Sequence, residues 1–82
     1  MRIALAAEVR GELAAQGMRL EELEGRAGVE HTSMWRYLSA KRAMPLDTLV
    51  AIAEGLGLSP SELLQRAEQR ARRNPQPGGG EH

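Results

Sequence analysis

The stretch LEELEGRAGVEHTSMWRYLS, residues 20–39, divides at Gly28 into two segments with helical spacing. In the first segment, residues 20–27, apolar residues stand four positions apart, on one face of a helix. Gly28 follows where a left-handed residue commonly ends a helix. The second segment, residues 31–39, starts almost at once. The sequence therefore predicts two short helices joined by a tight turn.

Two helices of this length, joined by a short turn that contains glycine, are typical of a helix-turn-helix, whose second helix enters the major groove of DNA. Many other helical hairpins share this pattern. The residues that the second helix presents outward therefore have to distinguish the two interpretations.

The apolar residues of the second helix predict which of its faces points outward. Val29, Met34 and either Tyr37 or Leu38 suit the core at helical spacing. The opposite face then carries the residues that we expect to read bases: His31, Thr32, Trp35 and Arg36.

These four side chains have the chemistry of base readers. Arg36 can donate two hydrogen bonds to guanine O6 and N7, Thr32 can contact a thymine methyl or exchange hydrogen bonds, and His31 can do either more weakly. Trp35 leaves two interpretations open, which are contact with sugars and thymine methyls or cover for neighbouring apolar surface. Phosphate contacts are expected from side chains that flank the same face: Arg19, Ser33, Ser39, Lys41 and Arg42.

Charge is unevenly distributed along a chain whose formal net charge is zero. Residues 31–46 contain no acidic residue, and they hold both aromatic residues of the protein, Trp35 and Tyr37. A second group of basic residues lies between Arg66 and Arg73. We interpret it as a solvated helix end whose cations suit the C-terminal dipole, with phosphate contacts or the edge of a dimer seam as alternatives.

The last helix has the clearest start signal in the chain. Ser59 suits the N-cap, Pro60 the first helical position and Glu62 the third-residue partner in a capping box. In the helix before it, spacing predicts one apolar face made of Leu46, Leu49, Val50, Ala53 and Leu56. The five expected helices cover about residues 3–16, 20–27, 31–39, 47–56 and 60–73.

At 82 residues the chain has room for one small core, which must be aliphatic because the protein contains no Phe. We expect one all-α domain of five helices over residues 1–73. Residues 74–82, NPQPGGGEH, contain two prolines, three glycines and no large apolar residue, so we expect a disordered tail.

Other functional classes find little support in the sequence. The chain has no Cys, which excludes disulfides, thiolate metal sites and a cysteine nucleophile. No spacing of residues indicates a catalytic, metal or cofactor site, and we expect none of the three. No apolar run reaches the ~20 residues of a membrane span, and the N-terminus is too polar for a secretory signal. We expect a cytoplasmic protein without enzymatic activity.

Taken in order, these features resemble the lambda-repressor-like, Cro/cI-type (XRE) helix-turn-helix family. The similarity extends from about Val9 to Leu64 and is most specific in its final stretch, which repeats the fourth helix, glycine turn and Ser-capped fifth helix. It is carried by Gly17, EEL (21–23), RAGV (26–29), SMWRYLSAKR (33–42) and PLDTLVAIAEGLGLSPSELL (45–64).

Several positions depart from the family's usual pattern. Arg19 and Leu20 stand where a Ser or Thr cap and a phosphate-binding Gln are common. Ala40 stands where Gly often ends the third helix, and a left-handed Ala costs on the order of 1 kcal/mol. Leu13 and Leu38 replace an Arg and a Glu that pair in many members, an exchange that is often neutral or stabilising.

The resemblance implies a bacterial or phage regulator that binds as a dimer to a near-palindromic DNA operator, with repression as the expected role. The alternative is a helix-turn-helix module that binds a protein, such as an antitoxin or a binder of a sigma factor or polymerase subunit. Zero net charge and an acidic second helix keep that alternative open. A weak homodimer could form through the last helix, along a seam of Leu63, Leu64, Ala67 and Ala71.

Overall fold

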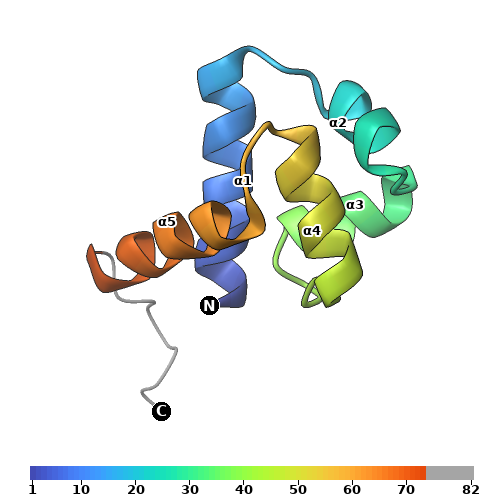
Figure 1. Ribbon diagram of the computed structural model, residues 1–82. Coiled ribbons are helices and arrows are strands. Elements are labelled where there is room, and N and C mark those ends of the chain that lie inside the picture. The colour runs from blue at the N-terminus through green and yellow to red at the C-terminus, as the bar shows by residue number, and fades with distance from the viewer. Residues whose placement is uncertain (74–82) are drawn as a thin grey trace.

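The protein is a bundle of five α-helices in the computed structural model, which describes residues 1–73 (Figure 1). The predicted all-α fold of five helices is confirmed. The expected disordered tail, residues 74–82, lies outside the described residues. The helices are α1 (Arg2–Gln16), α2 (Leu20–Ala27), α3 (His31–Leu38), α4 (Leu46–Gly55) and α5 (Pro60–Arg73).

Local sequence signals account for most of the helix ends. Gly17 and Gly28 both adopt the left-handed conformation and end α1 and α2, and for Gly28 this was predicted. At the start of α5, the backbone N–H of Glu62 donates to Ser59 Oγ at 3.1 Å, and the backbone N–H of Ser59 donates to Glu62 Oε1 at 3.2 Å. The predicted capping box is therefore present.

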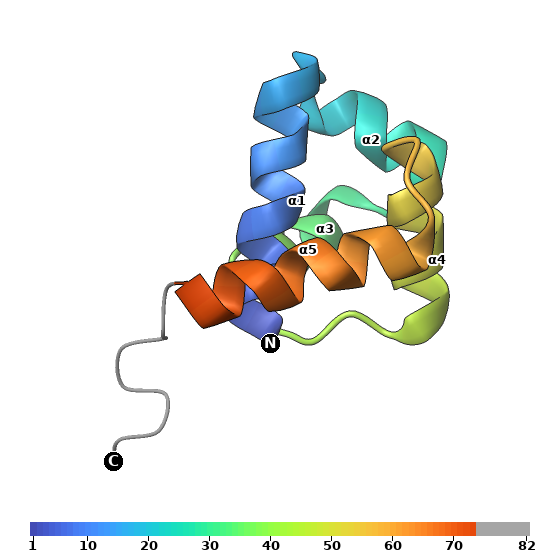
Figure 2. The same cartoon turned by 60° about the vertical axis from the view of Figure 1, so that its left-hand side comes forward.

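Helices α1 and α5, from opposite ends of the chain, form the main contact of the bundle. α5 crosses α1 at a steep angle, and Figure 2 shows the same crossing from a second side. Both helices contribute to a single aliphatic core, in which Val9, Leu23, Met34, Ile52 and Leu63 are fully buried.

Two ion pairs reinforce the contact between α1 and α5. Arg70 Nε donates to Glu8 Oε1 at 3.1 Å, and Arg66 Nη1 donates to Glu12 Oε2 at 2.5 Å. The Glu8 side chain is only 10% exposed, so its charge depends on this arginine for a partner. The arginines expected to form a solvated helix end are thus, in these two cases, bound to the first helix.

Helices α2 and α4 approach each other closely at Gly55. A Cβ at that position would lie 2.9 Å from Leu23 Cδ1 and 3.3 Å from Arg26 Cβ. Arg26 Nη1 also donates to the carbonyl oxygen of Gly55 at 3.3 Å. The absence of a side chain on Gly55 therefore sets the distance between the two helices.

The structure corrects two expectations about apolar faces. Leu46 was expected in the core but is 70% exposed, because it is the first residue of α4 and helical side chains lean toward the N-terminus, past the packed part of the helix. Ile52 of the same helix was not expected on the apolar face but is fully buried. Two residues of the expected homodimer seam, Leu63 and Ala67, are fully buried against the core and do not face outward.

Candidate nucleic-acid interface

The orientation of α3 is set by its inner face. Met34 is fully buried, and Leu38 and Tyr37 are less than a tenth exposed, as the helical register predicted. Val29, in the turn before α3, is half-buried against the same core. Four of the residues of this short segment therefore hold it to the bundle, and α3 has little freedom to rotate.

The outer face of α3 carries the four side chains that were predicted to read bases. His31, Thr32, Trp35 and Arg36 are all exposed. In residues 1–73, Arg36 forms no ion pair, so its guanidinium is available to a ligand. The register brings the four residues together on one exposed face.

His31, the first residue of α3, is bound to α2. Its Nδ1 lies 2.7 Å from Glu24 Oε2, with the His31 side chain 70% exposed and the Glu24 side chain 13% exposed. This contact was not predicted from the sequence, because it joins two different helices across the turn and no spacing within one helix indicates it. The two residues are seven positions apart, on either side of the turn.

The profile of the helix-turn-helix domain family matches residues 4–67 of the chain. The chain belongs to the helix-turn-helix domain family. This match confirms the resemblance to lambda-repressor-like proteins that the sequence indicated. Searches of curated proteins and of solved structures gave no match. None of the helices in residues 1–73 is long and apolar enough to cross a membrane.

In this helix-turn-helix domain, α2 and α3 are the pair that the turn at Gly28 joins, and α3 is the second helix, which enters the major groove in DNA-binding members of this class. The turn has the expected geometry, because the backbone N–H of Val29 donates to the carbonyl of Glu24 at 3.1 Å and Gly28 is left-handed. The outward face of α3 is thus the natural candidate for contact with bases.

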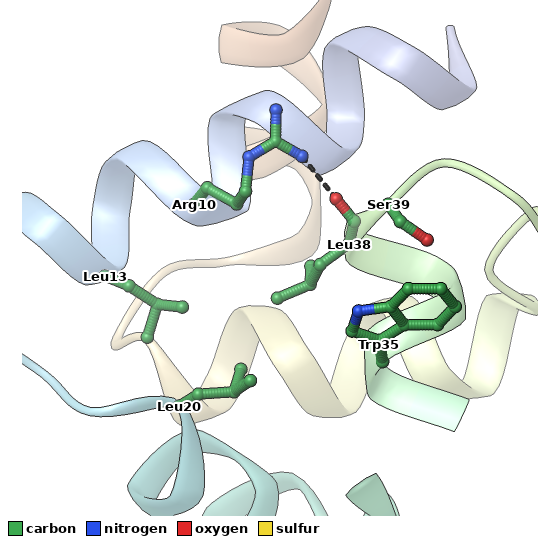
Figure 3. A pocket seen from close by; sticks show the side chains of 6 residues that line it. All are labelled: Arg10, Leu13, Leu20, Trp35, Leu38 and Ser39. Atoms are coloured by element: carbon green, nitrogen blue, oxygen red, sulfur yellow. Dashed lines mark hydrogen bonds between the residues drawn. The ribbon is translucent and has the colours of Figure 1, made fainter. Parts of the chain in front are cut away.

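Trp35 occupies a distinct place on this face of the helix-turn-helix domain. Its ring is half-exposed, and Lys41 Nζ lies 5.4 Å from the ring centroid, within the range of a cation–π interaction. The indole also forms one wall of an open, mainly apolar hollow of about 420 Å³ between α1, α2 and α3 (Figure 3). The other lining residues are Arg10, Leu13, Leu20, Leu38 and Ser39.

Arg10 connects α1 to the end of α3. Its Nη1 donates to the carbonyl oxygen of Leu38, the last residue of α3 (Figure 3). Carbonyls at a helix C-terminus lack intrahelical donors, so this arginine satisfies one of them. Leu13 and Leu38, which replace a charged pair common in the family, both lie in the core. The link between α1 and the end of α3 is made by the Arg10 side chain and the backbone carbonyl of Leu38.

The residues expected to contact phosphates differ in exposure and in the partners that they already have. Arg19, at the N-cap of α2, is exposed, as are Lys41 and Arg42 just after α3. Ser33 is half-buried and donates to Glu30 Oε1, and exposed Ser39 donates to the carbonyl of Arg36, both at 3.3 Å. The three cations have no ion pair among residues 1–73 and are the stronger candidates.

Proposed function

We propose that this helix-turn-helix domain is a sequence-specific regulator of transcription that binds double-stranded DNA by inserting α3 into the major groove. The observation that carries the proposal is the outer face of α3, which is exposed, contains no acidic residue and continues into Lys41 and Arg42. His31, Thr32, Trp35 and Arg36 would contact base edges. Phosphate contacts would come from Arg19, Ser33, Ser39, Lys41 and Arg42.

The position of the free cations supports this proposal despite the zero net charge. Arg66 and Arg70 are neutralised by carboxylates of α1, far from α3 in sequence. Lys41 and Arg42 have no such partner in the part of the chain described by the structure. The charge balance therefore hides a local excess of positive charge beside the candidate base-reading face, where phosphates of a bound duplex would lie.

A selection from duplexes with randomised sites, followed by binding titrations at increasing salt, tests the proposal. We expect an enriched motif, and we expect affinity for it to fall with a log–log salt slope of about −3 per copy if Arg19, Lys41 and Arg42 each neutralise one phosphate. Two copies on a near-palindromic operator would place their half-sites ~10 bp apart, one turn of the duplex. Absence of any enriched sequence at ~100 mM salt would refute sequence-specific binding.

The role of repressor rests on the resemblance to lambda-repressor-like proteins. A domain bound at an operator represses when the operator overlaps the DNA that the polymerase must occupy. A reporter whose promoter overlaps the selected motif should lose expression when the protein is supplied. Increased expression from that reporter would show activation instead.

One observation favours a second candidate, a protein-interaction module such as an antitoxin or a binder of a sigma factor or polymerase subunit. The hollow beside Trp35 is lined mainly by apolar side chains, and half-exposed Trp residues are common at the centres of protein interfaces. Protein binding that is lost in Trp35→Ala, together with no salt-dependent binding of duplex DNA, would favour this candidate.

A further inference from the structure

The contact between His31 and Glu24 determines what His31 can recognise. A carboxylate has only acceptors, so the short contact from Glu24 Oε2 to Nδ1 requires the hydrogen to be on Nδ1. In a neutral imidazole one nitrogen donates and the other accepts. With Nδ1 as the donor to α2, Nε2 is left as an acceptor.

Glu24 is well placed to impose this state. Its side chain is only 13% exposed, and it follows Leu23, which is fully buried in the core of the bundle. His31 has a 70% exposed side chain, so the rest of its ring is open to a ligand. The nearly buried Glu24 carboxylate thus binds Nδ1 of the His31 ring, while the Nε2 side of the ring is open to a ligand.

Base edges in the major groove differ in whether they offer donors. Adenine N6 and cytosine N4 are amino groups that donate, whereas guanine presents O6 and N7 and thymine presents O4, which accept. An Nε2 acceptor pairs with the two amino bases and is left facing another acceptor at guanine or thymine. Held in this state, the ring can therefore distinguish amino bases from keto bases.

We propose that Glu24 is a positioning residue that fixes His31 with Nε2 as a hydrogen-bond acceptor toward the major groove, so that His31 selects adenine or cytosine at one operator position. This inference rests on the proposed function, because it requires α3 to lie in the groove. In this proposal α2 contributes to sequence recognition through His31, without any contact between Glu24 and DNA.

Three variants test the inference in the same randomised-site selection, carried out at about pH 8.5, above the range in which histidines usually change charge, because in a charged imidazole both nitrogens would donate. His31→Ala identifies the position that His31 reads. Glu24→Ala removes the acceptor, and we expect the preference for adenine or cytosine at that position to weaken about three- to tenfold, the value of one hydrogen bond. Glu24→Gln keeps an acceptor in its amide oxygen and should retain the preference.

The two Glu24 variants have the same net charge, so they separate positioning from electrostatics. Loss of the negative charge should raise general DNA affinity equally in both. If both variants keep the preference, or both lose it to the same degree, Glu24 does not act through an acceptor. A preference for guanine or thymine in the unmodified protein would also overturn the inference. If the unmodified protein selects no sequence, the proposed function fails and the inference fails with it.

A second measurement needs no DNA and therefore distinguishes the two failures. Two-bond ¹H–¹⁵N correlation spectra of histidine report which ring nitrogen carries the hydrogen, and His31→Ala assigns the signals of the two histidines in the chain. At about pH 8.5, above the range in which histidines usually change charge, we expect Nδ1–H for His31. In Glu24→Ala we expect the Nε2–H form to increase. An Nε2–H form in the unmodified protein would overturn the inference and leave the proposed function standing.

Circular dichroism during thermal unfolding establishes that each variant is folded. Should Glu24→Ala fail to fold, the tautomer of the unmodified protein and the preferred base at the His31 position still decide the question.

Discussion

Ala40, two residues after the end of α3, has a backbone conformation that alanine seldom adopts. Its φ is +61°, and it is the one residue other than glycine with a positive φ among residues 1–73. The surrounding hydrogen bonds require this turn, since the backbone N–H of Lys41 donates to the carbonyl of Arg36 at 2.9 Å and that of Ala40 donates to Tyr37 at 3.1 Å. Ala40, which stands where Gly often ends the third helix, is therefore left-handed and bears the steric cost of that conformation.

Replacing Ala40 by glycine should stabilise the protein. Removal of the Cβ relieves about 1–2 kcal/mol of steric cost, and the added freedom of the unfolded chain offsets part of that gain. We expect the free energy of unfolding in urea to rise by about 0.5–1 kcal/mol. Ala43→Gly is the matched control, because Ala43 is exposed in the same connection without a positive φ, and it should give no gain. Equal effects of the two changes would contradict the explanation.

Arg36 is the residue for which base reading makes the sharpest prediction. Its guanidinium is exposed on α3 and has no carboxylate partner in the described chain. Arg36→Ala should relax preference at one operator position by about 1–3 kcal/mol, the worth of a bidentate contact with guanine. Titrations against single-base variants of the selected operator measure this loss.

Arg42→Ala provides the comparison for Arg36. Arg42 is also an exposed cation, but it follows α3 and is expected at phosphate. Its removal should weaken binding to all sequences alike and reduce the salt slope by about 1. If Arg36→Ala shows that same uniform loss, Arg36 contacts phosphate and does not read a base.

Between elements, the closest approach is that of α2 and α4 at Gly55. Glycine normally weakens a helix, so replacement by alanine should help unless space is lacking. Here the new Cβ would lie 2.9 Å from Cδ1 of Leu23, which is fully buried, so that either this side chain or the two helices would have to shift within the packed core. The packing of two helices, not the propensity of one, decides the outcome.

A pair of glycine replacements tests this explanation. Gly55→Ala should lower the free energy of unfolding by about 1–3 kcal/mol through overpacking. Gly25→Ala, in α2, should raise it by about 0.5–1 kcal/mol, because a Cβ there meets no atom within 4 Å and only helix propensity changes. Urea unfolding of both variants measures the difference. A gain in both would mean that α2 and α4 separate without cost.

Helix ends could be predicted from the sequence because their causes are local. Gly28 and the capping box of Ser59 and Glu62 act within a few residues of themselves. Gly55 could not be interpreted in this way, because its reason lies in α2, some thirty positions earlier. The error at Leu46 has a similar origin: spacing identifies an apolar face, but not how far along the helix the neighbouring helices extend.

For the whole molecule, the contact between α1 and α5 joins the two ends of the described chain. Arg70→Ala should leave the Glu8 carboxylate partly buried without its donor, and we expect a loss of about 1–3 kcal/mol in the free energy of unfolding. Arg72→Ala, which removes an exposed cation from the same helix end, should change it by no more than about 0.5 kcal/mol. Thermal or urea unfolding compares them.

A further variant identifies the cause of the loss in Arg70→Ala. Adding Glu8→Gln to it should recover part of the stability, because a neutral amide loses less than a carboxylate when water is excluded. No recovery would indicate that Arg70 stabilises α5 by packing its aliphatic stem.

The limits of sequence reasoning are clearest at this scale. Glu12 and Arg66 are 54 positions apart, and Glu8 and Arg70 are 62 apart, so periodicity along one helix says nothing of their pairing. For the same reason Leu63 was assigned to a dimer seam when it packs in the core. The outward face of α3 could be predicted, because residues within the segment itself determine it. The contacts of Glu24 with His31 and of Arg10 with the Leu38 carbonyl could not, because they come from other helices.

The half-exposed position of Trp35 has a practical consequence. It is the only tryptophan in the chain, so the indole emission of the protein comes from a single side chain on α3. Unfolding changes the solvent exposure of this half-exposed ring only modestly, whereas a duplex bound to α3 would cover the ring. Intrinsic fluorescence should therefore respond weakly to denaturant and strongly to a ligand that covers α3, so the unlabelled protein reports its own binding.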